Sequence, residues 1–426
     1  QYKQYNNITM KYISDLHIHS KYSRACSPQL TLENIDKHCQ IKGIQIVATG
    51  DFTHPAWFSD IKKNLVPAES GLYKFKDSNT ETRFLCSTEI ACIYSKGGQV
   101  RRLHIVIFAP SIEVVQKINT ALGKVGKLGS DGRPILGLDA KRLAEIIWEI
   151  DASCLIIPAH CWTPWFAVFG SKSGFDSLEE CFEEHAKKIY AIETGLSSDP
   201  AMNWRLSVLD KITLISNSDA HSLPNLGREA NVFEIAPEKL SYAEIRRIIR
   251  EKDREKFLYT IEFFPEEGMY HFDGHRACAI SLKPADTKKQ KGICPVCKKS
   301  LTIGVLNRVE ELADQPEGYR PEGTIPFKSL IELDKIIAEA LQVQSRNSKQ
   351  VQTEYNNLIN KVGPELKILL DEPLKNLAPH TTPEIVEGIR RVRAGKLIIK
   401  PGFDGQYGEI KIFQPDEISG RQTSLL

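Results

Sequence analysis

The sequence lacks a long apolar run, an internal repeat and a strong net charge, and each absence narrows the class of protein. No apolar stretch approaches the roughly 20 residues that span a bilayer, so we expect no transmembrane segment and no membrane partner. Residues 1–9 are polar and contain no apolar secretion core, which argues against a signal peptide and makes a cytoplasmic protein the default expectation. The residues before Met10 resemble an extension.

The near-balance of charge also limits what composition can say. Net charge is +2, and this neither indicates nor excludes a nucleic-acid partner, because a local basic groove can exist within a balanced total. With 426 residues, of which 41% are hydrophobic and 26% charged, the chain has the composition of a folded globular protein. It is long enough for a large core and for two or three domains.

Cysteine is present but mostly scattered. Seven of the ten cysteines stand singly in apolar or strand-like segments, and buried thiols in a reducing compartment explain them better than disulfides. These seven are Cys26, Cys39, Cys86, Cys92, Cys154, Cys161 and Cys181. The other three follow a different spacing and are treated below with the second half of the chain.

From residue 10 to about residue 240, short apolar runs alternate with helical patterns, which predicts β/α units. After an opening strand, the predicted strands cover residues 44–49, 84–90, 103–109, 154–159, 188–194 and 212–216. The predicted helices cover residues 31–42, 112–125 and 139–150. In a parallel β/α barrel the loops after the strands face one mouth, so side chains that follow the strands are expected to converge.

The opening strand is followed by Asp15-Leu16-His17-Ile18-His19, where two histidines at i and i+2 point to the same face. An isolated pair of this kind can equally be exposed or hydrogen-bonded in a loop. Later strand-like runs, however, end in further ligand-type residues. These residues are Glu89, His160, Asp219 and His221. A further strand-like run ends in Glu193, to which the pattern assigns no separate role. His104 stands at the start of its run, which suits a strand of opposite direction, and the whole series predicts a multinuclear metal cluster.

This series, together with Gly50-Asp51 and the segment 217–221, resembles the polymerase and histidinol phosphatase (PHP) family over about the first 230 residues. The resemblance implies a distorted seven-stranded β/α barrel that holds two or three metal ions and hydrolyses phosphate esters. It also implies the metal ligands. His17, His19, Glu89 and Asp219 would hold a first metal, and Glu89 would bridge to a second held by His104 and His160.

The third metal position of that family is altered here. Asp51 is followed by Phe52 where family members commonly have Asp-His, and Cys26 stands near the place of a further histidine. His221 matches a third-site ligand. Asp51, Cys26 or His54 are candidates for the others, although His54 is equally well explained as a surface loop histidine.

Such a cluster suits phosphodiester hydrolysis. Metal coordination lowers the pKa of bound water to about 7, and two ions roughly 3.5–4 Å apart stabilise the attacking and leaving oxygens together. Histidine and carboxylate ligands suit zinc, manganese or iron. We expect zinc in the cluster, with magnesium or manganese as alternatives for catalysis. Asp219, Glu89 and His221 are the candidate catalytic residues, mainly as ligands, with proton transfer by Asp219 or His221 as the alternative.

Candidate nucleic-acid contacts lie in two places. The loop after His160 carries Trp162, Trp165 and Phe166, which could stack on bases at about 1–3 kcal/mol each or pack together as the core of a lid. Several arginines could hold phosphates, although each alone would be an ordinary surface charge. These are Arg24, Arg101, Arg102 and Arg228 near the ligands, and Arg390 and Arg391 on a predicted C-terminal helix beside a Gly-rich aromatic loop at 397–408.

A second metal site is predicted from His275, Cys278, Cys294 and Cys297. Each pair has a two-residue gap, and fifteen residues separate the pairs, which is typical of a tetrahedral structural zinc. Such an ion replaces a hydrophobic core in a small module. His271 is the alternative fourth ligand, and free thiols are a further alternative that the paired gaps disfavour.

Helices are predicted at residues 304–313, 328–340, 347–361 and 383–394. We therefore divide the chain into a PHP-type barrel at 10–240, a zinc-binding module at 241–345 and a small helical C-terminal region at 346–426, an α/β protein in class.

The PHP-type segments, the His-Arg-x-Cys and Cys-Pro-x-Cys pairs, the segment 308–313 and the Pro-Gly-Phe-Asp-Gly loop are together similar to the endonuclease Q family over nearly the whole chain. The resemblance implies a DNA-repair endonuclease that hydrolyses the phosphodiester 5′ of a deaminated base (uracil, hypoxanthine or xanthine) or an abasic site. The implied partner is lesion-containing DNA, with a replication or repair clamp as a further candidate. The alternatives are a PHP-type small-molecule phosphatase, which would need no zinc knuckle, and a non-catalytic DNA-binding scaffold.

Overall fold

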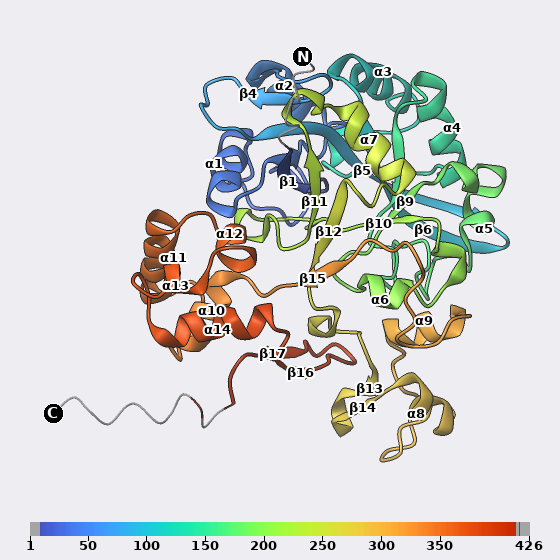
Figure 1. Ribbon diagram of the computed structural model, residues 1–426. Coiled ribbons are helices and arrows are strands. Elements are labelled where there is room, and N and C mark those ends of the chain that lie inside the picture. The colour runs from blue at the N-terminus through green and yellow to red at the C-terminus, as the bar shows by residue number, and fades with distance from the viewer. Residues whose placement is uncertain (1–8, 415–416, 418–426) are drawn as a thin grey trace, which may run out of the picture. The chain divides into compact units, whose positions relative to one another are not determined.

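The computed structural model describes residues 9–414 and residue 417, and within them the chain divides into two compact units (Figure 1). The first unit contains residues 9–40, 44–262 and 308–328, and the second contains residues 41–43 and 263–307 and the chain from 329 onward. The threefold division at residues 240 and 345 stays a prediction. None of the helices formed by these residues is both long enough and apolar enough to cross a membrane.

The first unit is built on a mixed sheet that places the ligand-bearing strand ends. Along the sheet the order is β12 (Phe257–Glu262), β11 (Ala230–Ile235), β1 (Met10–Asp15), β2 (Ile46–Ala48) and β5 (Arg83–Lys96), and β6 (Gln99–Ala109) connects β5 to β8 (Leu155–Pro158). Strand β1 is parallel to β2 and antiparallel to β11, which lies beside it in Figure 1 although it comes far later in the chain. Strand β6 is antiparallel to both β5 and β8, which confirms the reversed direction expected for the strand of His104.

The backbone ladders do not close into a barrel among the described residues. Strands β9 (Ala191–Glu193) and β10 (Thr213–Ile215) are only three residues long and form a separate parallel pair. Side chains bridge these short strands to their neighbours instead. Asn231 on β11 accepts from the Ser216 backbone at 3.0 Å, and Glu193 accepts from the His160 backbone at 2.9 Å. The α/β class is thus observed, whereas a closed seven-stranded barrel is not.

The helices of the first unit begin where the sequence offers caps. Ser111, Asp139 and Ser241 accept backbone hydrogen bonds at the starts of α3 (Ile112–Leu122), α4 (Ala140–Ile150) and α7 (Tyr242–Glu251). The other helices of this unit are α1 (Leu32–Lys42), α2 (Pro55–Asn64), α5 (Leu178–Phe182) and α6 (Pro200–Asn203). Short strands β3 (Leu65–Pro67), β4 (Tyr73–Phe75) and β7 (Ile135–Leu136) extend the sheet. Apolar residues of β1, β2, β6, β8 and α7 form the buried core.

The second unit contains a small hairpin module and a helical bundle. The module has β13 (Asp273–His275), β14 (Ile280–Leu282) and α8 (Pro284–Lys289). Helix α9 (Val305–Leu312) follows it, and from residue 308 onward its residues belong to the first unit. The helices are α10 (Leu333–Ala340), α11 (Lys349–Lys361), α12 (Glu365–Leu370), α13 (Leu374–Leu377) and α14 (Pro383–Arg393), and β16 (Ile398–Lys400) pairs with β17 (Glu409–Lys411). The helix predicted from residue 328 begins only at Leu333, because residues 327–329 form strand β15.

Candidate metal centre

The two histidines after β1 lie against the segment that carries Asp219. Ile18 and Ala220 form a parallel bridge, the backbone N–H of His19 donates to Ala220, and that of Asp219 donates to the carbonyl of His17 at 2.9 Å. Asp219 has a φ of +46°, which turns the chain sharply at this point. Residues about 200 positions apart in sequence are therefore held in one place by backbone hydrogen bonds.

A first donor group contains His17, His19 and Glu89, with Asp219 beside it. Nε2 of His19 lies 3.4 Å from Glu89 Oε2 and 3.0 Å from Asp219 Oδ1. Nε2 of His17 lies 3.8 Å from each of the same two carboxylates. Burial raises the pKa of the Asp219 carboxyl, but the close approach of His19 and the charges of both histidines outweigh it and lower that pKa well below its usual range. This group can hold a cation.

A second donor group shares Glu89. Its Oε1 lies 2.9 Å from His104 Nδ1 and 3.2 Å from His160 Nε2, and the two ring nitrogens are 3.1 Å apart. The shared carboxylate therefore faces both groups, as the bridging role predicted for Glu89 requires.

A third group contains His19, Asp219 and His221. Nδ1 of His221 is 2.8 Å from the backbone oxygen of Asp219, which leaves Nε2 as its second donor atom. The ring of His221 packs edge-on against that of His19, with 4.7 Å between centroids. The side chain of His221 is 30% exposed, so this end of the cluster is reached by solvent.

These donors fit divalent cations. His17 Nε2, His19 Nε2 and Asp219 Oδ1 are buried and take part in no hydrogen bond among the described residues, which is costly for polar atoms unless something else binds them. Two nitrogen ligands about 2.0–2.1 Å from one ion in tetrahedral geometry lie about 3.3 Å apart. The separations in the second group, 2.9 to 3.2 Å, are close to that value.

The structure corrects the prediction that Asp51 is a metal ligand. Its Oδ1 lies 2.9 Å from Nδ1 of His19, and its Oδ2 accepts from the backbone and hydroxyl of Ser20. Both oxygens are therefore engaged behind the histidine, because the chain turns at Gly50 and Asp51 with positive φ. Asp51 orients His19, as carboxylates behind metal-bound histidines commonly do.

The other third-site candidates lie outside the donor groups. His54 stacks on Tyr22 at 4.4 Å between centroids, and burial lowers the pKa of its imidazole. Burial raises the pKa of the Cys26 thiol to about 12. Neither residue belongs to a group of converging donors among the described residues.

Two residues near the centre had no role assigned from the sequence. Glu193 lies 3.0 Å from Nδ1 of His17 and accepts from Asn217 at 2.9 Å, so it orients a ligand from behind. Arg133 donates to Oε2 of Glu89 at 3.1 Å. The position of Glu193 at a strand end was a usable signal, whereas Arg133 lies in a loop that no spacing connects to the ligands.

The three aromatics of the loop after His160 differ in exposure. Trp162 is 1% exposed, donates its indole N–H to Asn203 at 2.8 Å and packs against Phe169, so it cannot stack on a base and is a core residue of the loop. Phe166 lies against the ring of His104, with 4.6 Å between centroids. Trp165 is 50% exposed and has the Arg102 guanidinium over its ring, which leaves it as the stacking candidate.

The candidate arginines also differ. Arg24 is exposed, while Arg228 donates from Nε to the backbone oxygen of Ser218 at 2.9 Å and so supports the ligand segment. Arg101 packs on the ring of Phe175.

On α14 the two predicted phosphate contacts are neutralised. Arg390 and Arg391 both pair with Glu387, and Arg391 also pairs with Glu417. Acidic residues at i−3, i−4 and beyond thus engage both side chains, and the contact of Arg390 and Arg391 with phosphates stays a prediction.

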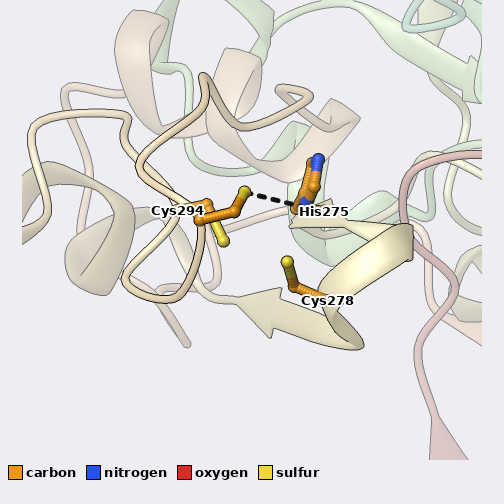
Figure 2. Close-up of side chains that lie close together, drawn as sticks. His275, Cys278 and Cys294 are labelled. Atoms are coloured by element: carbon orange, nitrogen blue, oxygen red, sulfur yellow. Dashed lines mark hydrogen bonds between the residues drawn. The ribbon is translucent and has the colours of Figure 1, made fainter.

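The four residues predicted to hold structural zinc converge in the second unit. The donor atoms of His275, Cys278, Cys294 and Cys297 lie within 4.8 Å of one another, and Figure 2 shows the first three facing a common point. Cys297 Sγ lies 3.6 Å from His275 Nδ1, and a sulfur and a nitrogen on one tetrahedral zinc would be about 3.6 Å apart. His271 is buried and does not belong to this group of converging donors. The histidine that lies with the three cysteines is therefore His275 and not the alternative, His271.

Comparison with known proteins matches residues 332–396 to the family model of the MJ0043 C-terminal domain. An uncharacterised protein of Methanocaldococcus jannaschii, MJ0043, is 33% identical over 267 residues, which is 61% of this chain but only 32% of that protein. The chain thus spans about a third of that relative. The uncharacterised YqxK of Bacillus subtilis is 27% identical and aligns over 94% of this chain and 99% of its own length.

Two solved structures are similar over nearly the whole length. The lesion-specific endonuclease PfuEndoQ of Pyrococcus furiosus has a TM-score of 0.84 and 31% identity, with 97% of this chain and 98% of that chain covered. Endonuclease Q in complex with a 27-mer duplex that carries an abasic lesion at the active site has a TM-score of 0.82 and 32% identity, with 97% and 99% covered. On this identity and coverage, the chain belongs to the endonuclease Q family.

Proposed function

We propose that this protein is a metal-dependent endonuclease that cleaves DNA at a lesion. The observation that carries the proposal is Glu89, a buried carboxylate that lies between two groups of histidines. Oε2 lies 3.4 Å from His19, and Oε1 lies 2.9 Å from His104 and 3.2 Å from His160, with His17 at 3.8 Å from the same oxygen. A shared carboxylate of this kind suits a pair of ions, which when bound would supply an activated water and neutralise the phosphate oxygens.

The protein's own residues prepare this chemistry. His17, His19 and Asp219 would hold one ion with Glu89, and His104 and His160 would hold the second with Glu89. Glu193 and Asp51 hold the rings of His17 and His19 from behind and fix which ring nitrogen faces the centre. His221 is partly exposed and carries its free Nε2 at the open end, where it can bind a third ion or pass a proton.

The substrate we propose is duplex DNA with a deaminated base (uracil, hypoxanthine or xanthine) or an abasic site, cut on the 5′ side of the lesion. Support comes from the whole-length likeness to endonuclease Q, whose structure includes a duplex with an abasic lesion at the active site. The lesion nucleotide would leave the stack most easily where pairing is already weak. Trp165, exposed beside Arg102, could then stack on a neighbouring base.

Zinc is the ion we propose for the four-residue cluster in the second unit, because its Cys3His donor set is typical of structural zinc. For the Glu89 cluster we propose zinc, with magnesium or manganese added for catalysis. A repair or replication clamp as partner stays a prediction.

The test is a nicking assay on a labelled duplex with and without one uracil, with manganese or magnesium. A single nick 5′ of the uracil, absent from the undamaged duplex, supports the proposal. Release of phosphate from a chromogenic monoester with intact DNA would favour the small-molecule phosphatase instead. Binding to the uracil duplex without any cleavage would favour the scaffold.

A further inference from the structure

The loop between η1 (Leu128–Ser130) and β7 lies directly on the metal centre of the first unit. Gly132 donates its backbone N–H to the carbonyl of Tyr22 at 3.0 Å, and Ala91 on β5 donates to the carbonyl of Pro134 at 3.1 Å. Asp131 accepts from the backbone N–H groups of both Arg24 and Arg133. The backbone on each side of Arg133 is thus tied to segments that carry cluster residues.

Gly132 allows this close approach. A Cβ at this position would lie 2.3 Å from Ser23 Oγ and 2.4 Å from Oδ2 of Asp51, the carboxylate that orients His19. Both distances are shorter than real Cβ contacts. Only glycine therefore permits the loop to sit this close to the cluster.

The loop places the Arg133 guanidinium at the shared carboxylate. Nη1 lies 3.1 Å from Oε2 of Glu89, and this is the one side-chain hydrogen bond that Arg133 donates to the described residues. The Arg133 side chain is 23% exposed, whereas Glu89 is fully buried. A guanidinium carries five N–H donors, so most of the donors of Arg133 remain for a group arriving from solvent.

The charges around Arg133 indicate what that group is. Glu89 and Asp219 are the carboxylates of the cluster. Cations bound between these carboxylates and the histidines would neutralise their negative charge. An arginine beside bound cations is then repelled unless an anion joins them. A phosphodiester oxygen is such an anion, and a planar guanidinium matches phosphate geometry.

We propose that Arg133 contacts a non-bridging oxygen of the scissile phosphodiester and stabilises the negative charge that builds on it during hydrolysis. This inference rests on the proposed function. The reaction consumes one water. Its oxygen forms a bond to phosphorus, one phosphorus–ester oxygen bond breaks with its electron pair, and the departing oxygen takes up a proton. A donor aimed at the non-bridging oxygen stabilises the transition state more than the ground state.

The experiment compares Arg133→Gln and Arg133→Lys with Arg142→Gln in single-turnover cleavage of a duplex with one uracil. Arg142 is a matched control because it lies on α4, is exposed, and pairs only with Glu145 and Glu149 among the described residues. Loss of one donor to a developing oxyanion lowers rates by about 10²–10³-fold, which is the effect expected for Arg133→Gln. Arg133→Lys should recover part of the rate, and Arg142→Gln should match the wild type.

Three further measurements distinguish a role of Arg133 in contacting the phosphate from a role in supporting Glu89. Metal content by elemental analysis and melting temperature should be unchanged in Arg133→Gln. Affinity for uncleaved uracil duplex, measured in the Asp219→Asn background, should fall less than tenfold. Sulfur substitution at the contacted non-bridging oxygen should slow the wild type more than the variant, because the variant has already lost that contact.

The outcomes distinguish the inference from the proposed function. If the wild type nicks uracil DNA and Arg133→Gln does so at the same rate, the inference fails while the proposed function stands. If metal content falls in step with the rate, Arg133 supports Glu89 and the inference is again overturned. If the wild type cuts no lesion duplex under any metal condition, the proposed function itself fails.

Discussion

The carboxylate of Glu193 lies 3.0 Å from Nδ1 of His17, on the side of the ring that faces away from the other cluster ligands. The same carboxylate accepts from the backbone N–H of His160 at 2.9 Å and from the Asn217 amide. One buried residue thus supports a ligand from each of the two donor groups that share Glu89.

Replacing Glu193 with Gln should therefore weaken metal binding without removing a ligand. Loss of a carboxylate behind a metal-bound histidine typically lowers metal affinity by about 10–100-fold. The measurement is competition for metal with a chelator of known affinity. Glu149→Gln, an exposed carboxylate on α4 that belongs to no group of converging donors among the described residues, is the control. Unchanged affinity in Glu193→Gln would remove this residue from the support of the cluster.

Replacing Asp219 with Asn should abolish cleavage while leaving lesion binding largely intact. Asp219 Oδ1 lies 3.0 Å from His19 Nε2 and has no hydrogen bond of its own among the described residues, so its role is toward a bound cation. Gel-shift affinity and single-turnover cleavage of the same uracil duplex measure the two effects. Cleavage retained at wild-type rate would exclude Asp219 from the active centre.

Replacing Cys294 and Cys297 with Ser should remove one bound zinc and lower the melting temperature. The four donors converge within 4.8 Å in a module with little apolar core of its own, so the ion supplies folding free energy there. Val296→Ser is the matched control, because this side chain lies between the two cysteines and is 64% exposed. Equal zinc content in the double variant and the control would rule out the knuckle.

The two tryptophans of the loop after His160 should separate stability from DNA binding. Trp162→Ala should cost about 3–5 kcal/mol of unfolding free energy, as other buried aromatic truncations do. Trp165→Ala should leave stability nearly unchanged and weaken DNA binding by about 1–3 kcal/mol if it stacks on a base. Denaturant unfolding and DNA titration measure the pair. A Trp165 variant with full DNA affinity would end the stacking proposal.

The buried carboxyl of Glu262 should make the free energy of unfolding fall as the pH rises. Burial raises the pKa of its carboxyl to about 8, although hydrogen bonds from Thr260, Thr194 and Ser216 oppose the shift. The folded state therefore holds a proton that the unfolded chain releases near pH 4.5. Its stabilising contribution is complete below pH 4.5 and is lost as pH rises through about 8, at up to about 1.4 kcal/mol per pH unit.

The check is denaturant unfolding of the wild type and of Glu262→Gln between pH 5 and 9. Glutamine has no proton to release, so the variant should lose the downward slope and gain stability relative to the wild type at high pH. Parallel pH profiles would show that Glu262 keeps its ordinary pKa.

The amino-acid sequence by itself identified most of the candidate ligand residues that the fold brings together and the elements that carry them. Two histidines separated by one residue in an extended chain share a face, and each two-residue gap brings His275 close to Cys278 and Cys294 close to Cys297. The convergence of the two pairs is a result of the fold. Apolar periodicity located α1, α3 and α4 to within a few residues. The direction of the strand that carries His104 was also evident, from the position of the histidine at its start.

The tertiary structure alone decided whether a carboxylate near the metal centre lies among the ligand atoms or behind the ring of a histidine ligand. Asp51 and Glu193 are carboxylates at strand ends like the ligands themselves, and only their distances to the far ring nitrogens of His19 and His17 assign them as supports. Trp162 and Trp165 are three residues apart, yet one is buried and the other exposed. Arg133 reaches Glu89 because a glycine lets its loop approach a turn about 80 residues earlier in the chain. Contacts of this kind depend on the relative placement of distant segments, which local sequence patterns do not encode.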